Sequence, residues 1–398
     1  MTNISSPIGI AVLGSTGTIG KNTLALVDQF PKRFQVVTLS ARGSDPEAVA
    51  AQIEKYRPKF VALELDAAAA TLRSRFPQVA FASGSEANAQ AAAFEGVTTA
   101  VVGIVGFAAL RPVIAAIRAG KRLALANKET LVAAGSIVRA ELAKNPDAEI
   151  IPVDSEHSAL FQILAGRDVS EVASLVLTAS GGPFLRQPEL NLATVTPAMA
   201  VAHPNWKMGP KISVDSATMM NKGLELVEAC FLYDVPESKV EIWVHPQSIL
   251  HGAVWFQDQS CLAQLSVPDM RQAIAYALSY PARLKSPIEK LDLLKMRQLD
   301  FFPPDEKRFP ALALARVALR SGPTALVALN AANEIAVDRF LNGALRFDRI
   351  ATVVSETLAS ITKHARADTE VASDLSAVFD TDAIARIEAE THARRYAD

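Results

Sequence analysis

Three carboxylates in the middle of the chain have the side-chain chemistry of a site for a hard divalent cation. Asp154 and Glu156 flank Ser155 directly after the apolar run EIIPV, and Glu225 lies further along in NKGLE. Such oxygen ligands suit Mg²⁺ or Mn²⁺, whereas zinc favours nitrogen and sulfur. The alternative is ordinary helix structure, with Asp154 or Ser155 as an N-cap and Glu156 as a first-turn acid.

The segment from Met219 onward has the apolar spacing of a helix. In a helix, Asn221, Lys222 and Glu225 stand at i, i+1 and i+4 and share one face, opposite an apolar face. An amide, a cation and a carboxylate together could bind a phosphorylated sugar and a metal ion. The alternative is that Lys222 and Glu225 form only a surface ion pair.

Groups suited to phosphate lie in the same part of the chain. The run LVLTA ends in Ser180, Gly181, Gly182, Pro183 and Phe184, a turn able to offer amides and a hydroxyl to an anion. Ser216 could add a second hydroxyl and His203 an imidazole. Taken singly these signals are weak, because Ser-Gly-Gly is a common loop and Ser216 could be a helix cap.

A glycine-rich turn near the start of the chain has the features of a dinucleotide site. The run IGIAVL leads into Gly14-Ser15-Thr16-Gly17-Thr18-Ile19-Gly20, and a helical stretch follows until Pro31. Glycines let backbone amides approach a pyrophosphate, and the helix N-terminus favours negative charge. The spacing is GxxGxxG rather than GxGxxG, so a tight turn without a ligand is the alternative.

The residues after the second predicted strand favour NADP over NAD. An NAD site places Asp or Glu there for the ribose hydroxyl, whereas this strand ends in Ser40, Ala41, Arg42 and Gly43. Arg42 would pair with a 2'-phosphate. The alternative is that Arg42 is merely a solvated surface side chain.

These motifs require elements that hold them in place. Short β-rich runs alternate with alanine-rich helical runs from Ile8 to about Val153, which predicts a parallel sheet with helices on both faces. A mixed α/β region follows, with a hairpin at Asp258 and Gln259. A stretch rich in proline, lysine and aspartate leads to a group of helices.

The expected fold class is therefore α/β, with an N-terminal Rossmann-like parallel sheet, a central α/β catalytic domain and a C-terminal helical bundle. We place the NADPH-binding domain at residues 1–152, the metal and substrate domain at 153–285, a linker at 286–312 and the bundle at 313–398.

The segment from Val201 to Pro210 is predicted to be a lid. Pro204, Gly209 and Pro210 oppose a regular helix, yet the segment carries the large apolar Trp206. Closing would let Trp206 cover the substrate and exclude water. The alternative is that Trp206 anchors the loop permanently to the core.

Composition limits the classes of protein to consider. Lys and Arg number 40 against 42 Asp and Glu, so the net charge of -2 gives no basic face for a nucleic acid. Cys230 and Cys261 lack zinc or disulfide spacing. With no signal-like or membrane-spanning run, we expect a cytoplasmic protein with no membrane partner.

Longer strings resemble the 1-deoxy-D-xylulose 5-phosphate reductoisomerase family. They span nearly the whole chain in family order: GSTGTIG at 14–20, LANKE at 125–129, PVDSEH at 152–157, SGGPF at 180–184, HPNWKMG at 203–209, ISVDSATMMNKGLE at 212–225, HPQS at 245–248, PDMR at 268–271 and NAANE at 330–334. Two departures are Gly43, where many members carry asparagine, and Pro210, where many carry arginine.

The resemblance implies a role for each matching residue. The cofactor contacts would be Thr16, Gly17, Thr18, Ile19, Ala41, Arg42, Gly43, Asn127, Glu129 and Gly209. The metal ligands would be Asp154, Glu156 and Glu225. The substrate contacts would be Lys128, Ser155, Glu156, Ser180, His203, Ser216, Asn221, Lys222 and Glu225, with Lys128, Asp154, Glu156, His203 and Glu225 at the catalytic centre.

The implied activity is an NADPH- and metal-dependent reductoisomerase of the non-mevalonate isoprenoid precursor pathway, active as a homodimer. It would turn 1-deoxy-D-xylulose 5-phosphate into 2-C-methyl-D-erythritol 4-phosphate. One rival is an NADPH-dependent semialdehyde dehydrogenase, which needs a reactive cysteine; Cys230 and Cys261 lie in an apolar helix and a predicted strand instead. A second rival is a nonenzymatic NADP-sensing protein, which has no use for the carboxylates.

Overall fold

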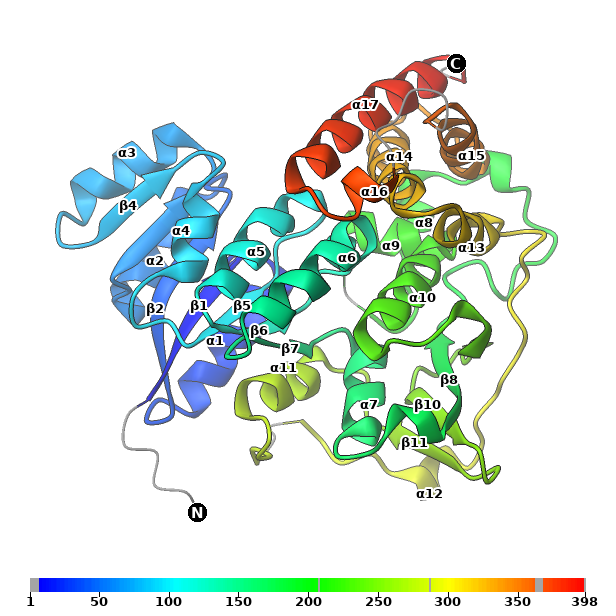
Figure 1. Cartoon of the computed structure of the whole chain (residues 1–398), viewed down its shortest axis with the longest axis horizontal. Helices are drawn as coiled ribbons and strands as arrows, with labels where there is room; N and C mark the ends of the chain where they lie inside the picture. Colours follow the sequence, from blue (N-terminus) through cyan, green and yellow to red (C-terminus); the bar gives the residue numbers. More distant parts are fainter. Residues whose placement is uncertain (1–6, 207, 286–287, 362–367, 397–398) are drawn as a thin grey trace. The chain divides into compact units, whose positions relative to one another are not determined.

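The computed structural model describes residues 7–206, 208–285, 288–361 and 368–396 (Figure 1). The chain forms two compact units. The first contains Met1–Asn127, Val138–Ser158 and Asp269–Glu289, and the second contains Lys128–Ile137, Ala159–Pro268 and Lys290–Asp398. The division into four segments stays a prediction.

The first unit is built on seven parallel strands in the order β4-β3-β2-β1-β5-β6-β7. This confirms the predicted parallel sheet. The strands are short and rich in valine, alanine and leucine, as expected of strands covered on both faces. Their bounds are β1 Ile8–Leu13, β2 Phe34–Ala41, β3 Phe60–Leu63, β4 Ala80–Ser83, β5 Thr99–Val102, β6 Arg122–Leu125 and β7 Glu149–Pro152.

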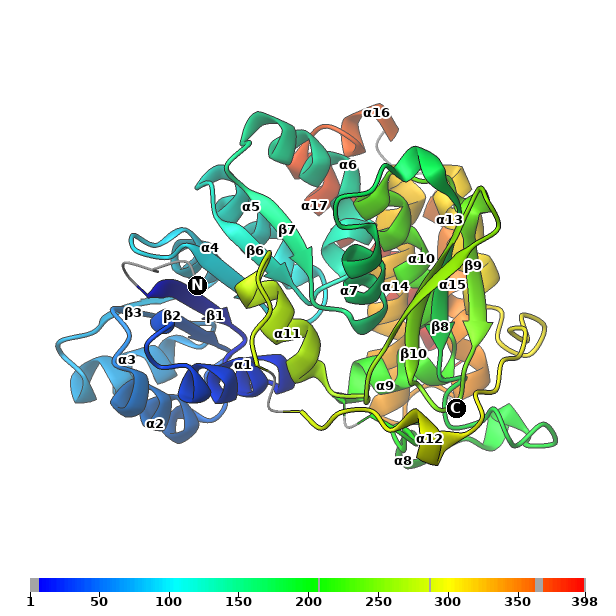
Figure 2. The same ribbon diagram turned by 90° about the horizontal axis from the view of Figure 1, so that it is seen from below.

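Helices cover both faces of this sheet. Figure 2 shows α1 and α2 on one face and α4 and α5 on the other. Local signals start some of them: Asp45 caps α2 by accepting a hydrogen bond from the Ala48 amide, and Pro46 occupies the first turn. The helices of this unit are α1 Thr18–Gln29, α2 Pro46–Tyr56, α3 Asp66–Arg75, α4 Ala87–Ala93 and α5 Leu110–Arg118, whereas α6 Glu129–Lys144 and α7 Ser155–Leu164 are each divided between the two units.

One helix of the first unit comes from much later in the chain. α11 (Met270–Ser279) packs against α1 and against strands β6 and β7. Arg122 of β6 donates a hydrogen bond to the carbonyl of Tyr280, just after α11, at 2.8 Å. The residues that follow the second sheet therefore return to the first unit.

The second unit contains a mixed sheet in the order β11-β10-β8-β9. β8 and β9 are parallel, and the other two pairs are antiparallel. The predicted hairpin joins β10 to β11, and Gln259 takes φ 69° in its turn. The strands are β8 Val172–Ala179, β9 Val240–Val244, β10 Leu250–Phe256 and β11 Cys261–Leu265.

Helices fill the rest of the second unit around a large apolar core. α10 packs against β8 and β9 and against α13, so it lies between the sheet and the C-terminal helices (Figure 1). The helical bundle is confirmed. The helices are α8 Pro197–Ala200, α9 Pro210–Ala217, α10 Met220–Tyr233, α12 Leu293–Met296, α13 Ala311–Ser321, α14 Pro323–Leu341, α15 Ile350–Ile361, α16 Asp368–Val371 and α17 Leu375–Arg394.

Short 3-10 turns connect several of these elements. They lie at Phe107–Ala109, Val169–Glu171, Leu192–Thr194, Glu237–Lys239 and Phe347–Arg349. The described part of the predicted linker, from residue 288, is largely irregular, but Phe302 pairs with Val244 of β9 through two backbone hydrogen bonds of 2.8 Å. None of the helices in the described ranges has the length and apolarity that crossing a bilayer would require.

Candidate active site

The turn between β1 and α1 is closed so tightly that two positions require glycine. Gly14 has φ +81°, and a Cβ built on it would lie 2.8 Å from the carbonyl oxygen of Gly103. A Cβ on Gly20 would overlap the carbonyl oxygen of Gly14. Since α1 starts at Thr18 with Gly17 as its N-cap, its first amides have no acceptor within the helix and fit a pyrophosphate. Four predicted residues lie here: Thr16, Gly17, Thr18 and Ile19.

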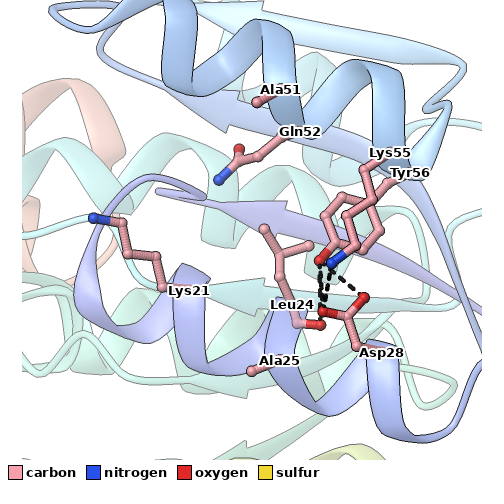
Figure 3. A pocket seen from close by; sticks show the side chains of 8 residues that line it. All are labelled: Lys21, Leu24, Ala25, Asp28, Ala51, Gln52, Lys55 and Tyr56. Atoms are coloured by element: carbon pink, nitrogen blue, oxygen red, sulfur yellow. Dashed lines mark hydrogen bonds and ion pairs between the residues drawn. The ribbon is translucent and has the colours of Figure 1, made fainter.

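A pocket of about 260 Å³ lies beside this turn, between α1 and α2 (Figure 3). Its acid, Asp28, pairs with Lys55 at 2.7 Å and accepts a hydrogen bond from Tyr56. Gln52 donates to the carbonyl of Ser15 at 3.0 Å and so braces the glycine turn from α2. None of the residues predicted for the site lines this pocket, which is formed by Lys21, Leu24, Ala25, Asp28, Ala51, Gln52, Lys55 and Tyr56.

The residues predicted to determine the preference for NADP over NAD lie at the end of β2. Ala41 is the last residue of the strand, and the Arg42 side chain is 71% exposed, with Nε 3.9 Å from a carboxylate oxygen of Glu64. An exposed pair at this distance leaves the guanidinium available. Gly43 has φ +90°, and a Cβ there would lie 2.9 Å from Cβ of Ala68. A larger side chain at this position would therefore require Ala68 to shift.

Asn127 organises the loops that follow β5 and β6. It is buried, and its amide donates to the carbonyls of Ile104 and Gly106, both at 3.0 Å. The side chain thus fixes the loop after β5. This loop also approaches α1, because a Cβ on Gly103 would lie 2.9 Å from Cβ of Ile19.

The first two predicted metal ligands lie at the N-terminus of α7. The carbonyl of Asp154 accepts from the Ser158 amide at 2.7 Å, which makes Asp154 the N-cap residue. Ser155 donates to a carboxylate oxygen of Glu156. All three side chains are half-buried. Asp154 is therefore an N-cap residue, as the alternative interpretation expected. Its carboxylate and that of Glu156 nevertheless lie together at the N-terminus of α7.

The third predicted ligand lies in a buried charged cluster of the second unit. Glu225 accepts from Lys128 at 2.9 Å on one oxygen and from Lys222 on the other, and Asn221 donates to it as well. Lys128 also donates to Asn221 at 2.7 Å. The Lys222 and Glu225 side chains are 3% and 1% exposed, so the surface-pair interpretation is wrong.

The residues predicted to bind phosphate form a second cluster in the same unit. Gly182 has φ +69°, and a Cβ on it would lie 2.8 Å from the carbonyl oxygen of Ser216. The glycine-rich turn after β8 and the end of α9 are therefore in contact. Ser180 accepts from the Gly182 amide at 3.1 Å and is 2.8 Å from the His203 ring.

The hydrogen bonds around His203 determine its tautomer. Its Nδ1 accepts from the amides of Asn205 and Trp206, at 3.2 and 3.0 Å. Nε2 must then carry the proton and donate to Ser180. Burial lowers the pKa of His203 to about 4, so the ring is neutral near pH 7 and acts as a hydrogen-bond donor.

The predicted lid has no regular helix from Val201 to Gly209 in its described residues, and α9 starts at Pro210. The ring of Trp206 lies 6.2 Å from that of His251, and Asn205 donates to Ser248 at 3.1 Å. Lys207 lies outside the described residues. Both the lid and the anchor interpretations fit these contacts.

Glu129 and Gly209, expected at the cofactor, lie in the second unit. Glu129 is the first residue of α6 and accepts from Lys211 at 2.5 Å, while Gly209 is the N-cap of α9. Lys211 is also 2.9 Å from Asp215. Sequence reasoning missed Lys211 and Asp215; their i, i+4 spacing within one helix was the available signal.

The cysteine chemistry of a semialdehyde dehydrogenase is missing. Cys230 lies in α10, where burial raises the pKa of its thiol to about 11. Cys261 lies in β11, where burial again raises the pKa. Both thiols are protonated at neutral pH, and thiolates are the reactive form.

A parallel sheet that leads from its first strand through a glycine turn into a helix defines a dinucleotide-dependent enzyme of the α/β class. Family models described as 1-deoxy-D-xylulose 5-phosphate reductoisomerase match residues 10–135, and models of its C-terminal domains match residues 150–233 and 265–388. The chain belongs to the 1-deoxy-D-xylulose 5-phosphate reductoisomerase family.

Relatives and solved structures agree with this membership. The reductoisomerase of Desulfosudis oleivorans is 50% identical over 89% of this chain and 92% of its own length. That of Ralstonia pickettii is 47% identical over 96% of both chains. A crystal structure of DOX-P reductoisomerase with NADPH, fosmidomycin and magnesium has TM-score 0.92, at 38% identity over 98% of this chain and 100% of that one. The Zymomonas mobilis enzyme with NADPH has TM-score 0.87, at 40% identity over 98% and 99%.

Proposed function

We propose that this chain rearranges 1-deoxy-D-xylulose 5-phosphate and reduces the product with NADPH to 2-C-methyl-D-erythritol 4-phosphate, a step toward isoprenoid precursors by the non-mevalonate route. The observation that carries the proposal is the buried cluster of Lys128, Asn221, Lys222 and Glu225, in a member of the family. Two lysines against one carboxylate leave a surplus positive charge for an anionic sugar phosphate.

NADPH is the proposed reductant, and related structures contain it. We assign Thr16, Gly17, Thr18 and Ile19 to its pyrophosphate, because the open amides of α1 suit an anion. Ala41, Arg42 and Gly43 are assigned to the adenosine end. Asn127, Glu129 and Gly209 are the remaining residues that we assign to NADPH binding.

We assign Asp154, Glu156 and Glu225 as ligands of Mg²⁺ or Mn²⁺; magnesium accompanies the related enzyme in crystal structures. The donor set fits, because a carboxylate oxygen has two lone pairs, and Oε2 of Glu225, which accepts from Lys222, can use its second lone pair to bind a cation. The cation would acidify a substrate hydroxyl and stabilise the charge that develops on the neighbouring oxygen.

The chain's own groups position the substrate and move protons. Lys128 holds its ammonium between Asn221 and Glu225, where it can stabilise a substrate oxygen and donate a proton to it. Glu156 is the second relay candidate. Ser155 adds a hydroxyl contact beside them.

The phosphate group is assigned to Ser180, Ser216, Asn221, Lys222 and His203. The neutral His203 offers Nε2–H as a donor, and Ser180 accepts from His203 and Gly182. The Ser180 hydroxyl proton can then point to a phosphate oxygen.

At the level of the whole chain we propose a cytoplasmic homodimer with no nucleic-acid or membrane partner. The four segments at 1–152, 153–285, 286–312 and 313–398 are proposed as its domains and linker. The near-zero net charge of -2 supports a small-molecule substrate over a nucleic acid.

One assay tests the proposal. NADPH oxidation should begin on adding 1-deoxy-D-xylulose 5-phosphate with Mg²⁺ or Mn²⁺, and chelation should abolish it. Metal-independent oxidation, or activity only with a semialdehyde, would contradict the proposal and favour the dehydrogenase.

A further inference from the structure

Lys128 and Glu129 lie on a single helical turn that is separated from the rest of α6. Ala134 has non-helical torsions, φ -142° and ψ 27°, and interrupts the helix after its first turn. The next residue, Gly135, packs so closely on the ring of Phe231 that a Cβ would overlap it. The first turn therefore depends on side-chain contacts for its orientation.

One of these contacts is a buried ion pair. Lys211, in the first turn of α9, donates to Glu129 at 2.5 Å and is 2.9 Å from a carboxylate oxygen of Asp215. Lys211, Glu129 and Asp215 have side chains only 18%, 8% and 2% exposed. Burial opposes the charge of Lys211, but Asp215 and Glu129 outweigh it and raise its pKa.

Further polar contacts connect this ion pair to the C-terminal helices. The other oxygen of Asp215 accepts from Asn333 of α14 at 2.8 Å, and Asn333 is fully buried within the NAANE motif. Its neighbour Glu334 pairs with Arg386 of α17 at 2.7 Å. A chain of polar contacts thus joins the first turn of α6 to the bundle.

A buried ion pair adds little net stability compared with apolar side chains of equal volume. Its main effect here is on the orientation of the first turn of α6. Lys128 is the N-cap of α6, since its carbonyl accepts from the amides of Leu131 and Val132 at 3.1 and 3.0 Å. Turning this short segment would move the Lys128 ammonium away from Glu225.

We propose that Lys211 is a positioning residue: by holding Glu129 it fixes the first turn of α6 and so directs Lys128 toward Glu225. Asp215 and Asn333 in turn hold Lys211. The proposal rests on the proposed function, in which Lys128 contacts substrate.

The test uses the full chain with Lys211→Met, Asn333→Ala and a control, Arg339→Met, which breaks the Arg339–Glu390 pair between α14 and α17. Hydrogen exchange at the Leu131 and Val132 amides reports the first turn directly. Lys211→Met should speed that exchange and lower kcat by at least about tenfold, because misplaced catalytic groups lose that much. Asn333→Ala should show the same pattern more weakly, and Arg339→Met should show neither change.

Unchanged exchange and turnover in Lys211→Met would overturn the proposal. So would an equal loss of kcat in Arg339→Met at an equal loss of melting temperature. If Lys211→Met does not fold, Asn333→Ala decides by the same two measurements. If the wild type does not turn over 1-deoxy-D-xylulose 5-phosphate, the proposed function fails, whereas the exchange data still test the positioning.

Discussion

Glu225 is a buried carboxylate that is held by two lysines. It accepts from Lys128 and Lys222 with 1% of its side chain exposed. Glu225→Gln should weaken metal binding and cripple turnover while leaving NADPH affinity nearly unchanged, because a charged ligand is lost. It should also destabilise the fold by about 3 kcal/mol or more, since two buried ammonium groups lose their carboxylate.

The matched control is Glu237→Gln, since Glu237 also forms ion pairs with two basic side chains, those of Arg316 and Arg320, at 2.9 and 3.2 Å. The control should keep metal binding and turnover. Asp154→Asn should repeat the metal defect. Wild-type metal affinity in Glu225→Gln and Asp154→Asn, measured by calorimetry, would remove the ligand assignment.

Arg42 is the residue on which the cofactor preference depends. Arg42→Ala should raise the NADPH KM about tenfold or more, because a charged contact to the 2'-phosphate contributes about 1.5 to 3 kcal/mol. The poor use of NADH should barely change. Steady-state kinetics with both cofactors measures this; an equal loss with both would make Arg42 a structural residue.

His251 makes the stability of the fold depend on pH. It is 4% exposed, bonds to Ser266 at 2.9 Å, and burial lowers its pKa to about 4. Between the unfolded value near 6.5 and about 4, the unfolded chain binds more protons than the folded one. Stability should therefore be fully present above pH 6.5 and fall by up to about 1.4 kcal/mol per unit as the pH falls.

Urea unfolding at about pH 7.5 and about pH 5 measures this dependence. His251→Gln should reduce the loss of stability between the two pH values by about 2 kcal/mol, because glutamine does not titrate. An identical pH dependence in the variant would show that other groups cause it.

Elements whose signals are local were predictable from the sequence. The parallel strands of the first sheet and the hairpin at Asp258 and Gln259 followed from apolar runs and turn residues. The helical face of Asn221, Lys222 and Glu225 followed from spacing alone, and the structure brings these side chains into contact.

The features that were missed depend on contacts distant in sequence. The interruption at Ala134 accompanies the packing of Gly135 on Phe231, almost 100 residues away along the chain. The burial of Lys211 and Asp215 depends on Asn333 and Glu129, which no local pattern reveals. Hydrophobic periodicity shows which face of a helix is buried but not which charges accompany it.

The segment from Val201 to Gly209 carries the prediction that belongs to the level of elements. Trp206→Ala should lower kcat/KM strongly with little loss of melting temperature, because an open lid admits water to the reacting substrate. In a chain with Trp243→Phe and Trp255→Phe, Trp206 is the only tryptophan, and its fluorescence should change on adding a phosphonate hydroxamate that mimics substrate. The same ligand should suppress protease nicking near Lys207.

A large fall in melting temperature in Trp206→Ala, with no ligand-dependent protection, would favour the anchor interpretation. Its contact with His251 makes that outcome measurable. Thermal unfolding of Trp206→Phe, which keeps an aromatic ring, is the matched control.

At the scale of the whole molecule, the second sheet has two edges that differ. At the β9 edge, Phe302 pairs with Val244, the last residue of the strand. At the other edge, β11 pairs only with β10 among the described strands, and Leu262, the second residue of β11, is 40% exposed. An uncovered strand edge offers unpaired backbone groups to another chain.

This difference suggests a test of the proposed homodimer. If β11 contributes to the interface between copies, Leu262→Lys should shift the dimer toward monomer, because a charge in an interface of about 800 Å² per partner is costly to bury. Light scattering with size-exclusion chromatography measures the mass, and Leu294→Lys, at an 89% exposed site in α12, is the control that should remain dimeric. Dimers that survive Leu262→Lys would place the interface on another surface, and a monomeric wild type would contradict the homodimer itself.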